Sequence, residues 1–175
     1  MWMSPGVVVA RSSTVDTASG QSRAVPITLV GAVRGPGLSH PPLDKDFSDL
    51  RVSPDGRKIA FIAHGDVFAA DADKGGAAER VTHTPAAEYD IAWAPDSRRL
   101  VYGSARDDAR HLYEYDFGSG NETVLTAGDG EDTSAAFAPD GKSLALLRDG
   151  RKLEILDLSG KRLHSIADGH MVEND

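Results

Sequence analysis

Six histidines are the first residues to test for metal chemistry, because neutral imidazole is the commonest side-chain ligand for metals. No two of them share the His-x-x-x-His spacing or another spacing typical of a metal site. We therefore interpret all six as surface or turn residues: His40, His64, His83, His111, His164 and His170. No metal and no other cofactor is predicted.

Carboxylates offer a second kind of site. The segment Asp129-Gly130-Glu131-Asp132 could bind calcium, but its spacing is not Asp-x-Asp-x-Asp-Gly, so we favour a solvated loop. Asp66, Asp90 and Asp132 each precede a strand-like run, where a carboxylate commonly accepts backbone N–H bonds; they could also line the mouth of a channel. Arg106 lies at a charged hairpin tip and completes this set of candidate contacts on the loops or channel face.

The sequence contains no local motif that is typical of a catalytic nucleophile. Serines are plentiful, but none lies in Gly-x-Ser-x-Gly. Gly118-Ser119-Gly120 precedes no helix and is therefore not a phosphate-binding loop. A Ser-His-Asp triad is assembled only in space, so the sequence does not exclude one. We expect that the chain is not an enzyme, although it could belong to a hydrolase whose catalytic domain is absent here.

Charge and composition narrow the classes of partner. The chain carries 27 Asp and Glu against 19 Lys and Arg, a net charge of −8, which opposes binding to nucleic acid and to anionic membranes. No run approaches the roughly 20 apolar residues that span a bilayer, so membrane insertion is not predicted. The absence of cysteine excludes disulfides and thiolate metal sites. The first residues do not resemble a signal peptide.

One short phrase occurs three times and predicts the elements that position these residues. It is Ser53-Pro54-Asp55-Gly56-Arg57, then Ala94-Pro95-Asp96-Ser97-Arg98, then Ala138-Pro139-Asp140-Gly141-Lys142. The prolines are 41 and 44 residues apart, within the range of four-stranded propeller blades. Proline presets φ, aspartate bonds its own backbone and glycine accepts a positive φ, so the phrase predicts a hairpin turn. Ser97 replaces the glycine, and that turn could differ slightly.

Short apolar runs flank each phrase and repeat with it. In the second unit they cover residues 91–93, 100–103, 112–116 and 122–126, and the third run ends in aspartate. Runs of this length between breakers, with no 3.6-residue period, are typical of strands. The sequence therefore predicts an all-β fold, a partial β-propeller of about three and a half four-stranded antiparallel blades.

The repeat also predicts how the chain is divided. The expected parts are a partial blade at 1–29 (the last strands of a preceding blade), a Gly/Pro-rich linker at 30–46, three blades within 47–169 (47–83, 89–127 and 132–167) and a truncated tail at 170–175. Such a set of blades cannot close a ring, and its last blade exposes a strand edge and an apolar face. We expect a fragment of a longer protein, which the abrupt ends favour, or copies that complete one another.

The three phrases, with a third strand that ends in aspartate, resemble the WD-like propeller repeat of TolB. From about residue 24 to residue 169 the chain is most similar to the propeller regions of tricorn-type peptidases and of amidohydrolases with TolB-like propellers. The resemblance implies blades around a channel and a periplasmic or exported bacterial location. It also implies protein docking, as in TolB, or routing of peptides, as in tricorn-like enzymes. No catalytic residue is transferred, because those lie in domains that this chain lacks.

We therefore predict a non-catalytic propeller segment that acts as a scaffold for a protein or peptide. One alternative is the substrate-gating propeller part of a larger tricorn-like peptidase or amidohydrolase. Another is a self-assembling propeller scaffold completed by dimerisation. The expected partners are accordingly a protein or peptide, with a second copy or further blades of the same chain.

Overall fold

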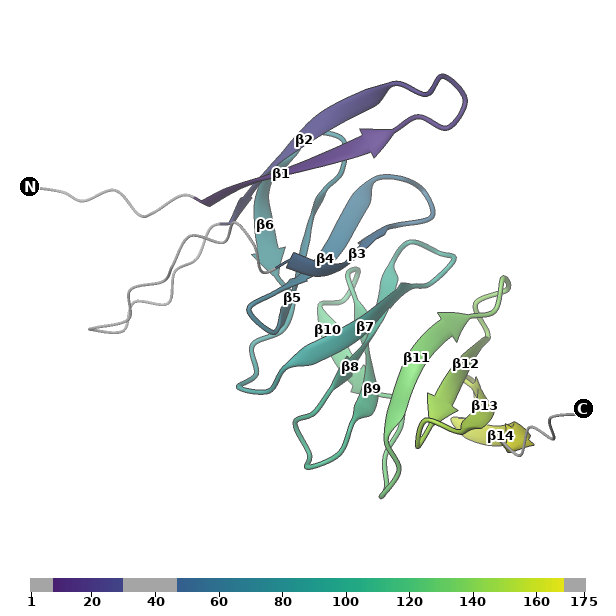
Figure 1. Ribbon diagram of the computed structural model, residues 1–175. Helices are drawn as coiled ribbons and strands as arrows, with labels where there is room; N and C mark the ends of the chain where they lie inside the picture. The colour runs from purple at the N-terminus through teal and green to yellow at the C-terminus, as the bar shows by residue number, and fades with distance from the viewer. Residues whose placement is uncertain (1–7, 30–46, 169–175) are drawn as a thin grey trace, which may run out of the picture. The chain divides into compact units, whose positions relative to one another are not determined.

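A computed structural model describes residues 8–29 and 47–168 of the chain (Figure 1). Every regular element in these ranges is a β-strand, and the sheets remain open, which confirms the all-β, partial-propeller prediction. The predicted linker at 30–46 and the predicted tail at 170–175, with His40 and His170, lie outside the described residues. Two compact units are present, residues 1–83 and residues 84–175.

The first unit contains blade 1 and an N-terminal hairpin. Blade 1 is an antiparallel meander of β3 (Phe47–Val52), β4 (Lys58–Ala63), β5 (Asp66–Asp71) and β6 (Gly76–Arg80). The hairpin of β1 (Val8–Val15) and β2 (Ser22–Leu29) extends this sheet to six strands, because β2 pairs in parallel with β6. Its assignment to a preceding blade stays a prediction.

Two side chains of β2 hold the hairpin on blade 1. Val25 is 1% exposed and packs with Ile59, Phe61 and neighbouring alanines of the blade. Arg23 donates hydrogen bonds to the Asp73 carbonyl oxygen (2.8 Å) and carboxylate (2.9 Å). Because the ion pair is largely exposed, it contributes little, whereas burial of a valine contributes roughly 1.5–3 kcal/mol. The apolar contact therefore dominates.

The second unit contains two blades that pack face to face. Blade 2 comprises β7 (Glu88–Trp93), β8 (Arg99–Ser104), β9 (His111–Asp116) and β10 (Asn121–Val124). Blade 3 comprises β11 (Asp132–Phe137), β12 (Ser143–Arg148), β13 (Lys152–Asp157) and β14 (Arg162–Asp168). Each is a four-stranded antiparallel meander (Figure 1).

A single apolar cluster joins these two blades. Blade 2 contributes Val101, Leu112 and Leu125, and we call this its trailing face. Blade 3 contributes its leading face, which carries three buried leucines: Leu144, Leu146 and Leu156. Alternate residues of a strand point to opposite faces of the sheet, so each blade has both faces.

Arg99 adds a polar link between blades 2 and 3. It donates hydrogen bonds to Asp96 (2.7 Å) and Glu114 (3.2 Å) of blade 2 and to the Gly141 carbonyl oxygen of blade 3 (3.3 Å). Burial raises the pKa of the Glu114 carboxyl group, although Arg99 opposes that effect. The blade junction therefore has an apolar centre and a charged edge.

The repeated phrase forms the turn between the first and second strands of each blade. In every case the N–H of the fourth residue donates to the carbonyl oxygen of the first, over 2.8 Å at Gly56, 3.0 Å at Ser97 and 2.9 Å at Gly141. These three residues have φ of 72°, 57° and 68°. Ser97 thus adopts the left-handed conformation of the two glycines, and its turn does not differ in kind.

A second turn, between the third and fourth strands, is built on the aspartate that ends the third strand. The Asp71 carboxylate accepts backbone N–H bonds from Asp73 (2.8 Å) and Lys74 (2.7 Å), and Asp116 and Asp157 make equivalent turns. In the N-terminal hairpin, Asp16 accepts from Ala18 and Ser19 in the same way. That hairpin therefore has the turn chemistry of the outer half of a blade.

Candidate binding face

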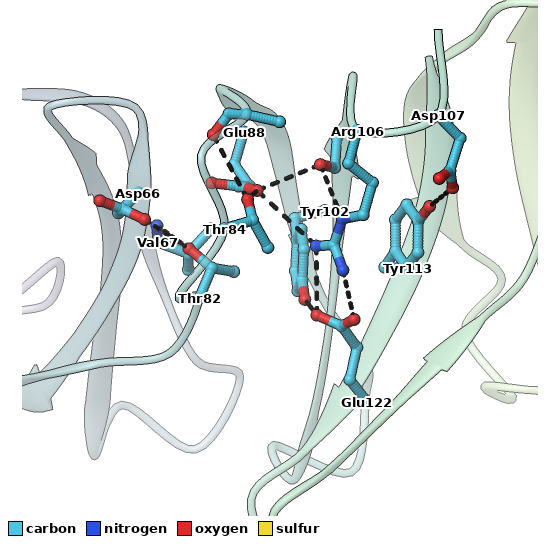
Figure 2. Close-up of polar contacts among 12 residues, drawn as sticks. Asp66, Val67, Thr82, Thr84, Glu88, Tyr102, Arg106, Asp107, Tyr113 and Glu122 are labelled. Atoms are coloured by element: carbon cyan, nitrogen blue, oxygen red, sulfur yellow. Dashed lines mark hydrogen bonds and ion pairs between the residues drawn. The ribbon is translucent and has the colours of Figure 1, made fainter. Parts of the chain in front are cut away.

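The candidate site lies where the second and third strands of a blade are joined and where one blade leads to the next. Two threonines fix these connections. The Thr82 hydroxyl accepts the Val67 N–H over 2.9 Å and donates to Asp66 over 3.3 Å (Figure 2). In blade 2, the Thr126 hydroxyl accepts the Leu112 N–H over 2.9 Å. Each connection is thus tied to the start of the third strand of its own blade.

Asp66, one of the predicted contacts, bonds to other residues of the first unit. Its carboxylate forms an ion pair with Arg80 over 2.7 Å, in addition to the bond from Thr82. Only 14% of its side chain is exposed. The geometry thus gives Asp66 a role in joining β5 to β6 and to the connection that follows.

Arg106, the second predicted contact, is the centre of a polar cluster on blade 2 (Figure 2). Its guanidinium donates two hydrogen bonds to Glu122 and one to Ser104, and it lies 3.9 Å from the centre of the Tyr113 ring. Burial disfavours the charged form of Arg106, but its bonds to Glu122 outweigh this and raise its pKa. The arginine therefore remains charged and joins β8 to β10.

Two tyrosines extend this cluster. Tyr102 donates its hydroxyl to Glu122, and Tyr113 donates to Asp107 over 2.6 Å (Figure 2). Burial, and then the bond to Asp107, raises the pKa of Tyr113 to about 12. Burial and Glu122 raise the pKa of Tyr102 as well. Both phenols therefore stay protonated near neutral pH and act as donors.

Glu88 begins β7, the first strand of blade 2, and has a fully buried carboxylate. We call the first strands of the three blades, β3, β7 and β11, the innermost strands. It accepts hydrogen bonds from Thr84 (2.7 Å) and Ser104 (3.1 Å), and Arg106 lies 3.7 Å away (Figure 2). The sequence interpretation missed Glu88. Its position at the start of the first strand, equivalent to Asp132 in blade 3, was the signal that could have identified it.

Asp132, the third predicted contact, also has a fully buried carboxylate. It accepts two hydrogen bonds from Arg148, over 2.7 and 2.9 Å, and His111 Nδ1 of blade 2 lies 3.7 Å away. His111 is 5% exposed, so the expectation of a surface or turn residue was wrong for it. In this structure Asp132 lies inside the junction of blades 2 and 3.

Asp90, the fourth predicted contact, lies on the innermost strand of blade 2. It has φ of 54° at a register shift between β7 and β8, and Asp49 and Ser134 occupy the same position in blades 1 and 3. Its carboxylate accepts the Ser134 N–H over 3.0 Å. The repeated bulge bends each innermost strand, and here it also joins two of these strands.

The first strand of each blade offers a strand edge as a candidate binding surface. β3, β7 and β11 are each the last strand of their sheet, so one edge of each has no neighbouring strand within that sheet. On β3, Leu50 and Val52 are each 47% exposed, and Arg51 beside them is also exposed. A strand edge with apolar side chains is the kind of surface that binds an extended peptide.

Solved structures of known proteins share the fold of these blades. No family model matches the chain. TolB from Acinetobacter baumannii superposes with a TM-score of 0.60 at 20% identity, over 93% of this chain and 41% of that one. The chain carries blades of a TolB-like β-propeller. Dipeptidyl peptidase 4 from Porphyromonas gingivalis superposes with a TM-score of 0.59 at 16% identity, over 74% of this chain and 27% of that one.

Proteins with sequences similar to these TolB-like blades also include a TolB and a dipeptidyl peptidase. The Tol-Pal system protein TolB of Francisella tularensis subsp. mediasiatica is 33% identical over 79 residues, 42% of this chain and 18% of that protein. Dipeptidyl-peptidase 5 of P. gingivalis is 33% identical over 93 residues, 43% of this chain and 14% of that protein. The chain thus spans less than a fifth of either relative. The resemblance to tricorn-type enzymes stays a prediction.

Proposed function

We propose that this TolB-like chain is a non-catalytic scaffold that binds an extended peptide or a segment of a protein at the innermost strands. The observation that carries this is the open edge of β3 beside exposed Leu50 and Val52. An added strand could lie along the edge of β3 that has no neighbouring strand in its sheet, and its alternate side chains would contact the two apolar residues.

The polar cluster supports a scaffold over an enzyme. Arg106 binds Glu122 and lies 3.7 Å from the Glu88 carboxylate, and Tyr102 donates its hydroxyl to Glu122. A catalytic base or nucleophile must reach its substrate at hydrogen-bond distance. These groups are instead occupied in holding β8, β10 and the connecting loops of blade 2.

The test is selection and titration of peptides. Peptides selected from a displayed random library should bind the purified chain, and fluorescence polarisation then measures the Kd. We expect Leu50→Lys to weaken binding at least tenfold, because the charge prevents apolar contact at the edge. Val124→Lys, which changes an exposed valine on blade 2, is the matched control and should bind as the parent does. Failure to select any peptide, or equal binding by both variants, would overturn the proposal.

A second candidate function is substrate gating within a larger peptidase. The similarity to dipeptidyl-peptidase 5, at 33% identity over 93 residues, favours it. The discriminating observation is the reading frame that encodes the chain. A peptidase module in the same frame would favour gating, and the selected peptides should then be substrates of that module. A frame without such a module would favour the free scaffold.

An exported or periplasmic location belongs to the same proposal and rests on the TolB resemblance. Among the described residues there is no helix with the length and apolarity required to cross a membrane. Fractionation of the source cells tests the location. Recovery with a periplasmic marker enzyme is expected, and recovery with a cytoplasmic marker would contradict it.

A further inference from the structure

The connection between blades 2 and 3 contains the Asp-Gly pair at residues 129–130. An aspartate isomerises most readily before glycine, because glycine has no side chain to hinder attack of its backbone nitrogen on the preceding carboxyl group. The same pair occurs at residues 55–56, 140–141, 149–150 and 168–169. Gly169 lies outside the described residues, so the surroundings of four pairs can be compared.

The repeated phrase holds both reacting groups in two of these pairs. The Gly56 N–H donates to the Ser53 carbonyl oxygen over 2.8 Å, and the Asp55 carboxylate accepts the Arg57 N–H over 3.0 Å. The phrase at residues 138–142 makes the equivalent two bonds, over 2.9 and 3.0 Å. In each turn the glycine nitrogen and the carboxylate are therefore directed at other partners, and the turn resists the rotation that attack requires.

The other two pairs differ from each other. The Asp149 carboxylate accepts the Glu131 N–H over 3.0 Å, and the Asp149 N–H donates to the Glu131 carbonyl oxygen over 2.8 Å. Asp129, in contrast, is exposed, and neither its carboxylate nor the Gly130 N–H bonds to another residue of the described chain. Of the four pairs, this one leaves both reacting groups available.

The unbonded pair lies in a short segment between two anchors. On one side, the Leu125 N–H donates to the Leu112 carbonyl oxygen over 2.8 Å. On the other side, the Asp132 N–H donates to the Arg110 carbonyl oxygen over 2.7 Å. Two of the four residues between the anchors, 127–130, are glycines, which rotate at little steric cost. The segment can therefore reach the geometry of attack while both blades stay folded.

We propose that Asp129-Gly130 is a site of spontaneous isomerisation to isoaspartate in the folded protein. The Gly130 nitrogen forms a bond to Cγ of Asp129, and its proton leaves with the carboxyl hydroxyl group as water, which gives a cyclic succinimide. Water then attacks the main-chain carbonyl carbon of Asp129 and breaks its bond to the Gly130 nitrogen. The chain now continues through Cγ, the main-chain carboxylate of Asp129 is free, and the mass is unchanged.

The product should loosen the junction of blades 2 and 3. The main chain gains one atom shortly before Asp132, whose carboxylate accepts hydrogen bonds from Arg148 over 2.7 and 2.9 Å. The stem of Arg148 passes close to the modified segment, since a Cβ added to Gly130 would lie 3.0 Å from Arg148 Cδ. A longer main chain between fixed anchors must displace this contact.

Peptide mapping of aged protein tests the site. The purified chain is kept at pH 7 for several weeks and digested with trypsin. The peptide of residues 111–142 contains both Asp129 and Asp140, so the two rates are compared within one molecule. Electron-transfer fragmentation locates isoaspartate, and we expect it to form at least fivefold faster at Asp129 than at Asp140. In concentrated urea the two rates should become similar, because unfolding removes the bonds that hold Asp140.

Asp129→Glu is the matched variant, because its longer side chain would have to close a less favourable six-membered ring. It also leaves Gly130 and its contact with Arg148 intact, which Gly130→Ala would not. The aged parent should unfold at a lower urea concentration than fresh parent, whereas aged Asp129→Glu should match its fresh form.

Four outcomes would overturn the proposal. The site would be wrong if isoaspartate formed equally fast at Asp140 in the folded chain, or formed at Asp129 only in urea. The effect on the blade junction would be wrong if parent carrying isoaspartate at Asp129 were as stable as fresh parent, or if aged Asp129→Glu lost as much stability as aged parent.

Discussion

The trailing faces of blades 2 and 3 are built from one repeat but have different surroundings. In blade 2, Leu112 and Leu125 pack against the leucines of blade 3. In blade 3, their counterparts Leu153 and Ile166 are among the most exposed large apolar residues of the described chain. The internal geometry of each blade is nevertheless the same, with a four-stranded meander and two kinds of fixed turn.

The difference shows that the turns form each blade, whereas the faces join blades together. The phrase at Pro95 and the aspartate turn at Asp116 are made within blade 2, by bonds between residues close in sequence. The face contact needs residues from two blades and supplies the burial that a single four-stranded sheet lacks. Stability and association should therefore respond to different substitutions.

The largest expected effect comes from truncating the covered face. Leu112→Ala should lower the free energy of unfolding by about 2–5 kcal/mol, because it leaves a cavity in a packed cluster. Leu153→Ala, at the equivalent exposed position, should cost less than about 1 kcal/mol, since little buried area is lost. Urea unfolding measures both. Equal losses would mean that the two faces are equally covered in solution.

The next effect concerns the buried pair at the junction of blades 2 and 3. Asp132→Asn should lower the free energy of unfolding by about 2–3 kcal/mol, because it leaves the partly buried Arg148 charge without its main partner. Asp73→Asn removes the acid of an exposed pair with Arg23 and should cost less than about 1 kcal/mol. A loss at Asp132 no larger than that at Asp73 would show that the junction pair contributes little.

A smaller effect, with a defined pH dependence, is expected at the aspartate turns. Backbone N–H donors hold the pKa of Asp116 below 3.8, as do the Ser159 donors for Asp157. A folded pKa below the unfolded one gives stability that is fully present above the unfolded value and is lost as the pH falls through the folded value. Asp116→Asn should therefore be less stable than the parent at pH 7 and should approach it as the pH falls through the folded pKa of Asp116.

Asp157→Asn should behave as Asp116→Asn does, although its blade has a bare face, because both turns are local. Thermal unfolding between pH 3 and pH 7 gives the comparison, and Asp129→Asn, in the connection between blades, is the control. Convergence with the parent at Asp116 but not at Asp157 would show that coverage of a blade affects its turns.

These same turns explain how much of the fold the sequence predicts. Pro54, Asp55 and Gly56 form a turn by bonds within six residues, so their types and order suffice to identify it. The parallel pairing of β2 with β6 has no such signal, because it depends on Val25 meeting a core built from residues 59–78. Sequence reasoning therefore identified the blades but not the position of the hairpin.

The candidate site was less predictable for a related reason. Asp66, Asp90, Arg106 and Asp132 were identified by residue type and by their place beside strands, which does not distinguish a channel contact from an internal ion pair. Arg148, the partner of Asp132, is 16 residues away, and His111 approaches Asp132 from another blade. Such pairings depend on how strands and blades pack, and a single sequence does not show that.

The smallest expected effect measures how far a turn depends on the neighbouring blade. Gly56→Ala should cost about 1 kcal/mol from its positive φ alone, because an added Cβ there meets no atom within 4 Å. Gly141→Ala carries the same backbone cost, but its Cβ would lie 3.4 Å from the Arg99 guanidinium of blade 2. It should therefore cost slightly more, unless that flexible side chain shifts. Gly56→Asn should cost less than Gly56→Ala, because asparagine tolerates the left-handed conformation. Chemical denaturation of the three variants measures these losses of stability. Equal losses at Gly56 and Gly141 would show that the Arg99 side chain of blade 2 does not affect the turn at Gly141 of blade 3.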